Sequence, residues 1–146
     1  MRDWNASARR RRGAAAAAVV ALAIAVPGCG TPSADLFVVT RTGTIPGARL
    51  TLRVDDGGQV RCNRGAKREL GSDRLLTARE LVREFESAAR TGTVLATGRN
   101  GVLSYRFRLE AGTVAFGDTS RGQSPVMRRS QAFVRDVAKN VCGLQR

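Results

Sequence analysis

The chain has no histidine, and this absence bears first on catalysis. Histidine is the usual general base near neutral pH and the usual activator of a serine or cysteine nucleophile, so both kinds of catalytic site are excluded. Carboxylates do not replace it, because the one adjacent pair, Asp55-Asp56, precedes Gly57-Gly58, where a turn explains both acids. We therefore predict no catalytic residue, no cofactor and no enzymatic activity.

Cysteine is also scarce, with three in the chain: Cys29, Cys62 and Cys142. Without histidine they do not complete a zinc site, so no metal centre is predicted. If Cys29 has another use, Cys62 and Cys142 remain as an even pair. In an oxidising compartment such a pair is expected to form a disulfide. Two separate buried thiols are the alternative.

Long apolar runs are few. The clearest is GAAAAAVVALAIAV, residues 13–26, which is shorter than the roughly 20 residues needed to span a membrane. It follows four arginines, Arg9 to Arg12, and this order is typical of a secretory signal peptide. The predicted division is a leader over 1–28, a cysteine and short linker over 29–34, and one domain over 35–146. Cleavage at an Ala-x-Ala site inside the run and a retained transmembrane helix are the alternatives.

The end of this leader reads Val26-Pro27-Gly28-Cys29 and resembles the lipobox of bacterial lipoproteins. Val26 and Gly28 match that pattern, whereas Pro27 stands where Ala, Ser or Thr is usual. The resemblance implies a diacylglyceryl thioether, with palmitate-type chains, on Cys29. It also implies an extracytoplasmic protein that is lipid-anchored to the cell membrane, because two acyl chains hold a protein stably where one does not.

Acidic residues are fewer than basic ones, 12 against 25. Residues 1–28 hold five of the basic and one of the acidic residues, so 20 and 11 remain after the leader, a net charge of +9. A basic exported domain suits anionic headgroups or wall polymers. Nucleic acid is not an expected partner, because the chain is exported and has no recognition motif.

The hydrophobic pattern after residue 35 predicts strands and helices in two similar halves. Five stretches read as strands: 36–41, 49–55, 59–62, 103–109 and 113–117. A capping box, Thr77 with Glu80, predicts a helix over 77–90, and Ser124-Pro125 predicts a second one that ends before Gly143. Residues 63–73 read as a polar loop. The order β-β-β-α-β-β-α predicts an α+β domain, an antiparallel sheet of about five strands with two helices packed on one face.

Strand alternation also separates four arginines from the apolar residues beside them: Arg53, Arg61, Arg106 and Arg108. If both helices cover one face of the sheet, these side chains share the other face. They are the candidate binding surface. The plainer interpretation is the solvated side of a half-exposed sheet.

Several stretches of the mature region carry a resemblance: DLFVVTRTGTIPGARLTLRV, GGQVRCN, LSYRFRL, GTVAFGDTSRG and VRDVAKNVCGL. They are similar to a group of uncharacterised actinobacterial lipoproteins, which implies no activity. The plan of residues 39–43, a helix, residues 105–118 and a final helix is more distantly similar to emfourin-type inhibitors of metallopeptidases. That resemblance implies inhibition through the loop 42–47 or a sheet edge.

These observations predict a membrane-anchored lipoprotein whose non-catalytic domain binds an envelope partner. A surface-anchored metallopeptidase inhibitor and a binder of anionic envelope polymers are the two alternatives. The pattern sets no oligomeric state.

Overall fold

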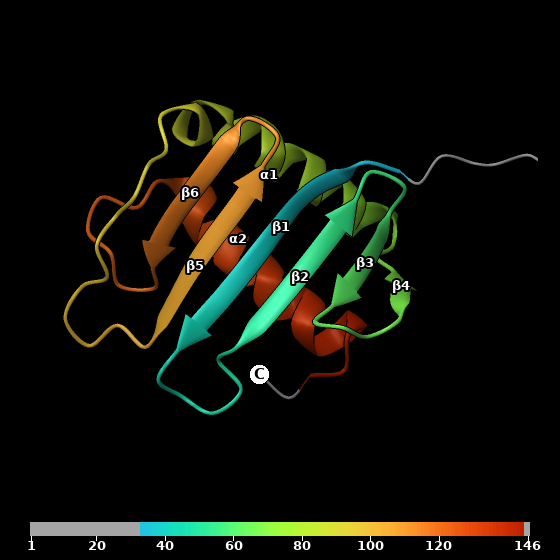
Figure 1. Ribbon diagram of the computed structural model, residues 1–146, viewed down its shortest axis with the longest axis horizontal. Coiled ribbons are helices and arrows are strands. Elements are labelled where there is room, and N and C mark those ends of the chain that lie inside the picture. The colour runs from blue at the N-terminus through green and yellow to red at the C-terminus, as the bar shows by residue number, and fades with distance from the viewer. Residues whose placement is uncertain (1–32, 145–146) are drawn as a thin grey trace, which may run out of the picture. The chain divides into compact units, whose positions relative to one another are not determined.

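The computed structural model describes residues 33–144, which form an antiparallel six-stranded sheet with helices on one side (Figure 1). Along the chain the elements are β1 (Asp35–Gly43), β2 (Leu50–Asp55), β3 (Gln59–Cys62), β4 (Lys67–Glu69), α1 (Ser72–Arg90), β5 (Leu103–Leu109), β6 (Gly112–Gly117), α2 (Pro125–Asp136) and the π-helical turn η1 (Val137–Val141). Across the sheet the order is β4-β3-β2-β1-β5-β6. The predicted α+β class is confirmed, with one strand more than expected.

The predicted leader, Cys29 and most of the predicted linker lie outside the described residues. Within residues 33–144, no helix combines the length and apolar character that crossing a bilayer requires.

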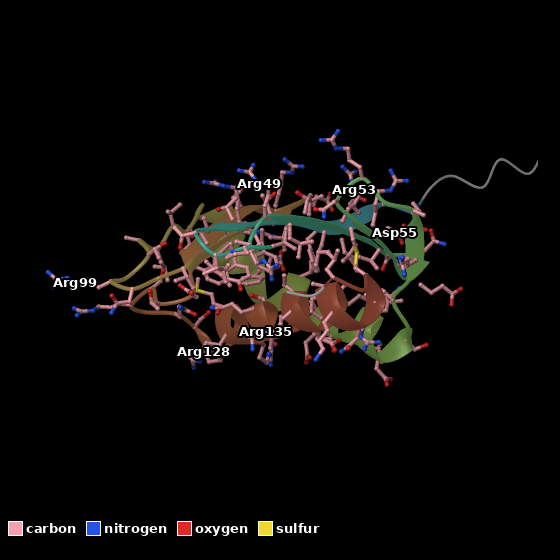
Figure 2. All side chains as sticks on the ribbon, turned by 90° about the horizontal axis from the view of Figure 1, so that it is seen from below. Arg49, Arg53, Asp55, Arg99, Arg128 and Arg135 are labelled. Atoms are coloured by element: carbon pink, nitrogen blue, oxygen red, sulfur yellow. A yellow bond between two sulfur atoms is a disulfide. The ribbon has the colours of Figure 1, made fainter. Side chains whose placement is uncertain are left out.

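Both helices cover the same face of the sheet. They lie behind it in Figure 1 and below it when the sheet is seen edge-on in Figure 2. The core forms between these layers, because alternate residues of each strand point at the helices. Most predicted inward residues of the strands are buried: Leu50, Leu52, Val54, Val60, Tyr105, Phe107, Leu109, Val114 and Phe116. Leu103 and Cys62, also predicted to face inward, are half-buried. The opposite face of the sheet carries no helix, and we call it the open face.

The segment predicted as a polar loop, residues 63–73, is the main correction. Lys67–Glu69 form edge strand β4, which pairs with β3, and Leu70 behind it is buried. All three residues of β4 are exposed and charged, so the stretch has no apolar alternation to reveal it. Edge strands often carry charge of this kind, which discourages pairing with another chain.

The first helix begins five residues before the predicted start. Gly71, with φ of 85°, precedes it, and Asp73 lies in its first turn. The capping box is therefore wrong. The Thr77 hydroxyl donates to the Asp73 carbonyl oxygen inside the helix at 2.9 Å. Apolar periodicity located the middle of the helix and not its beginning.

The second helix begins at Pro125 as predicted, but the Ser124 side chain makes no capping hydrogen bond. Its last turn widens into η1, in which the Cys142 amide donates to the Val137 carbonyl oxygen at 3.0 Å. Gly143 follows with φ of 67°, a left-handed conformation that suits glycine and ends the helix.

A tight approach between α1 and β6 gives a stability prediction. Gly112 has φ of 141°, and a Cβ there would stand 2.2 Å from the Ala89 carbonyl oxygen. We expect Gly112→Ala to lower the free energy of unfolding by about 3 kcal/mol, measured by urea unfolding. Gly122→Ala is the control, because φ is 76° there but nothing lies within 4 Å of the new carbon. It should cost about 1 kcal/mol, and equal losses would contradict the steric argument.

Candidate functional site

The structure places all four predicted arginines, exposed, on the open face. Arg53 pairs directly with Arg61 across β2 and β3, and Val38 of β1 lies opposite both Arg53 and Arg108. Lys67 of β4 continues the line, because it lies opposite Arg61. We call this cross-strand line the basic row: Lys67, Arg61, Arg53, Val38 and Arg108. With strands about 4.8 Å apart, it extends about 19 Å across the sheet.

Val38 is the apolar member of the basic row. It lies on the open face, yet it is only 8% exposed. Its two cross-strand neighbours are arginines, whose long aliphatic stems can cover an apolar side chain while their charged ends stay in water. The basic row therefore places one guanidinium group, that of Arg53 or of Arg108, on each side of a valine that is shielded from water.

Two cations of the basic row have acidic partners. Arg53 Nη1 lies 2.7 Å from Asp35 Oδ2, and Lys67 Nζ lies 3.0 Å from Asp55 Oδ2. In the described part of the chain, the other predicted arginines make no ion pair: Arg61, Arg106 and Arg108. Like charges directly opposite one another destabilise a sheet, so the Arg53–Arg61 pair is a cost to folding that an anion could offset.

The sequence prediction missed three further cations of this face. Arg49 shares the alternation of Arg53, and Figure 2 shows both projecting from the open side of the sheet, whereas Arg128 and Arg135 lie on the helix side. The alternation of residues 49–55 was enough to find Arg49. Lys67 and Arg64 were not visible, because their segment read as a loop.

A concave region on the open face, which we call the basic hollow, has a volume of about 520 Å³. Its cations are Arg53, Arg61, Arg64 and Lys67, and its carboxylates are Asp35 and Asp55. Ser33, the first described residue, also lines it.

Asp55 helps to hold the basic hollow together. Burial raises the pKa of its carboxyl group. Hydrogen bonds from the Gln59 amide at 2.9 Å and from the Lys67 ammonium group at 3.0 Å lower the pKa, and together the lowering effects are larger, so the net shift is downward. Asp56 instead accepts a hydrogen bond from Arg79 Nε of α1 at 2.8 Å. Both acids of the adjacent pair thus tie the β2–β3 turn to its surroundings.

A second concave region, about 360 Å³ in volume, lies beside Arg106. Its lining is rich in hydroxyl groups: Thr40, Thr42, Thr97 and Ser104. One wall is formed by residues 94–97, in the segment that runs along the outer edge of β6. There the Leu95 amide donates to the Ala115 carbonyl oxygen at 2.8 Å, and the Ala115 amide donates to that of Thr93 at 2.9 Å.

The loop 42–47, the predicted inhibitory loop, is held in place by hydrogen bonds from the Arg41 side chain to the backbone at its end. This side chain is 4% exposed, and it donates from Nε to the Ala48 carbonyl oxygen at 2.9 Å and from Nη2 to that of Gly47 at 3.0 Å. Tyr105 lies opposite Arg41 on β5, and burial raises the pKa of its hydroxyl group. The loop is therefore exposed and braced at once.

Cys62 and Cys142 are paired at disulfide distance, as predicted, with Cα atoms 6.2 Å apart. The bridge joins the end of β3 to the residue that follows η1. It therefore fastens the strand that carries Arg61 to the helical layer.

Two ion pairs connect the helices: Glu84 of α1 pairs with Arg129 of α2, and Asp136 at the end of α2 pairs with Arg74 of α1. Arg74 Nε of α1 lies 2.6 Å from Asp136 Oδ2, and this hydrogen bond, with a second from Asn140, lowers the pKa of the Asp136 carboxyl group. A lowered folded-state pKa stabilises the protein above the ordinary value of 3.8, and the stabilisation is lost as pH falls through the folded-state value.

We therefore expect Asp136→Asn to reduce stability near neutral pH and to weaken the loss of stability that follows as pH falls below about 4. Urea unfolding across this range measures the effect. Arg74→Gln keeps the Asp136 carboxylate and removes its main hydrogen-bond partner, so it should also weaken the dependence of stability on pH in the same range. Parent-like pH dependence in both variants would show that the ion pair does not act on acid stability.

Within residues 33–144, no three potential metal-ligating side chains gather at one place. The chemistry that this face offers is charge and hydrogen bonding spread over several strands, an arrangement suited to binding an extended anion.

Comparison with protein-family models, with curated proteins and with solved structures finds no match to this chain.

Proposed function

We propose that this protein is an extracytoplasmic lipoprotein, anchored through Cys29, whose domain binds an anionic component of the cell envelope with the open face of its sheet. The observation that carries the binding half of the proposal is the basic row. Three strands bring Arg61, Arg53 and Arg108 into one line across the sheet, and two of these three have no acidic partner among residues 33–144.

An anionic partner fits this face for a physical reason. Arginine holds phosphate and carboxylate groups through two parallel hydrogen bonds, and several arginines in a line match several anions of one polymer or surface. Such binding weakens as salt screens the charges. Support for the anchor comes from the leader and from the lipobox-like residues 26–29.

The anchor is tested by localisation. We expect the parent protein to fractionate with membranes and Cys29→Ser to be released, and mass spectrometry of the mature N-terminus should find a diacylated cysteine. A Cys29→Ser protein that stays with the bilayer as the parent does would overturn the anchor.

The binding surface is tested by charge reversal. Arg61→Glu, Arg106→Glu and Arg108→Glu together should abolish salt-sensitive retention on isolated envelope material, measured by cosedimentation. The matched control reverses three exposed arginines outside the sheet, Arg99, Arg121 and Arg128, with the same change in net charge. If both triple variants lose retention equally, net charge and not the open face is responsible.

A second candidate is the surface-anchored metallopeptidase inhibitor, and the bracing of the loop 42–47 by Arg41 favours it. A loop that is held before binding loses little conformational entropy when it docks into a cleft. An inhibitor would form a stoichiometric complex with a peptidase, and that complex would persist at high salt. The basic row instead predicts a complex that dissociates as salt is added.

A further inference from the structure

The starting point is where the described chain begins. Ser33 lines the basic hollow, and Cys29 lies four residues before it. Four residues extend at most about 14 Å, whatever their conformation. If Cys29 carries the acyl chains, the edge of the basic hollow at Ser33 therefore lies within about 14 Å of the backbone of the acylated residue.

This distance matters because of the range of the membrane's electric field. The headgroup region of a bilayer is itself several ångströms thick, and charges interact over about 8 Å at physiological ionic strength. A domain on such a short tether does not stand clear of the headgroups.

The charge of the basic hollow suits that surface. Its two carboxylates are already paired, Asp35 with Arg53 and Asp55 with Lys67. Arg61 and Arg64 are exposed and form no ion pair within residues 33–144, so they remain available to an external anion. A further acid on this face is Glu69, which lies opposite Gln59 at the sheet edge.

We propose that the basic hollow docks on anionic phospholipid headgroups of the same bilayer that holds the lipid anchor, and that this turns the open face toward the membrane. The inference rests on the proposed function, since it needs both the anchor at Cys29 and anion binding by the open face. It adds the identity of the anion, a phospholipid phosphate. An acyl anchor and a basic cluster are two signals that reinforce one another.

The first test measures affinity without the anchor. Because residues 33–144 belong to one compact unit with its own core, the chain from residue 29 with Cys29→Ser is a suitable probe. We expect it to bind vesicles containing phosphatidylglycerol at least about tenfold more tightly than vesicles of phosphatidylcholine alone. Arg61→Glu with Arg64→Glu should remove this preference, whereas the control pair Arg99→Glu with Arg121→Glu should keep most of it.

The second test uses the lipidated protein in nanodiscs. Amide hydrogen exchange of residues 59–69, which form β3, β4 and the turn between them, should be slower in discs with phosphatidylglycerol than in neutral discs. The amides of α1 and α2 should exchange equally in both. Equal protection of β3–β4 in the two lipids would overturn the proposed orientation.

The outcomes separate this inference from the proposed function. Retention on wall polymers without any preference for anionic vesicles overturns membrane docking and leaves anion binding by the open face intact. Loss of the preference in both charge-reversed pairs overturns the basic hollow as the docking site. Binding to neither material overturns both proposals.

Discussion

Removing the bridge with Cys62→Ser and Cys142→Ser will lower the free energy of unfolding by about 4.5 kcal/mol. The reason lies in the unfolded chain, where the bridge closes a loop between residues that are 80 positions apart and so reduces the conformational entropy of that state. Urea unfolding of the oxidised parent and of the double variant measures the difference. A domain of this size has only about 5–15 kcal/mol of stability, so the loss is a large part of it.

The control is the response to reductant. Dithiothreitol should bring the parent close to the double variant and leave the variant unchanged. A parent that keeps its full stability after complete reduction would contradict the role assigned to the bridge.

Phe107→Ala should lower the free energy of unfolding by about 3–5 kcal/mol. Phe107 has no exposed surface, and its ring lies between layers, with centroid distances of 5.1 Å to Phe85 of α1 and 5.6 Å to Phe37 of β1. Its ring also stacks on Phe116 at 6.0 Å. Truncation removes these contacts and leaves a cavity that the sheet and helix do not close.

The matched control is the next residue of the same strand. Arg108 is exposed on the open face, so Arg108→Ala should cost no more than about 1 kcal/mol, including the loss of its stem from Val38, while weakening anion binding. Comparable losses of stability in the two variants would mean that the two faces of β5 are not as different as this packing requires.

Much of this fold is readable from alternation alone. In residues 103–109, Tyr105, Phe107 and Leu109 alternate with Arg106 and Arg108, and period two assigns each to one face before any neighbour is known. The burial of the first three and the exposure of the arginines follow that assignment. The middle of helix α1 was predicted from a different periodicity, the four-residue spacing of Leu81, Phe85 and Ala89.

Where the local signal was weak, the prediction was wrong. β4 is three charged residues that pair with the edge of β3, and the helix after it is preceded by a glycine that offers no capping hydroxyl. Lys67 and Arg64 were missed with that segment. Secondary structure that depends on a distant partner leaves little trace in the nearby residues.

The sequence by itself determined that Arg53, Arg61, Arg106 and Arg108 lie opposite the apolar residues of their strands, and it determined the class of the fold and the pairing of Cys62 with Cys142. Period-two spacing, helical spacing and cysteine parity are properties of the chain. Only the tertiary structure decided that Arg61, Arg53 and Arg108 share one line around Val38, and that the chain enters the domain beside the basic hollow. Register between strands depends on the turns and on a bulge near Asp35, and a shift of one residue in a strand would turn the arginines of that strand toward the core.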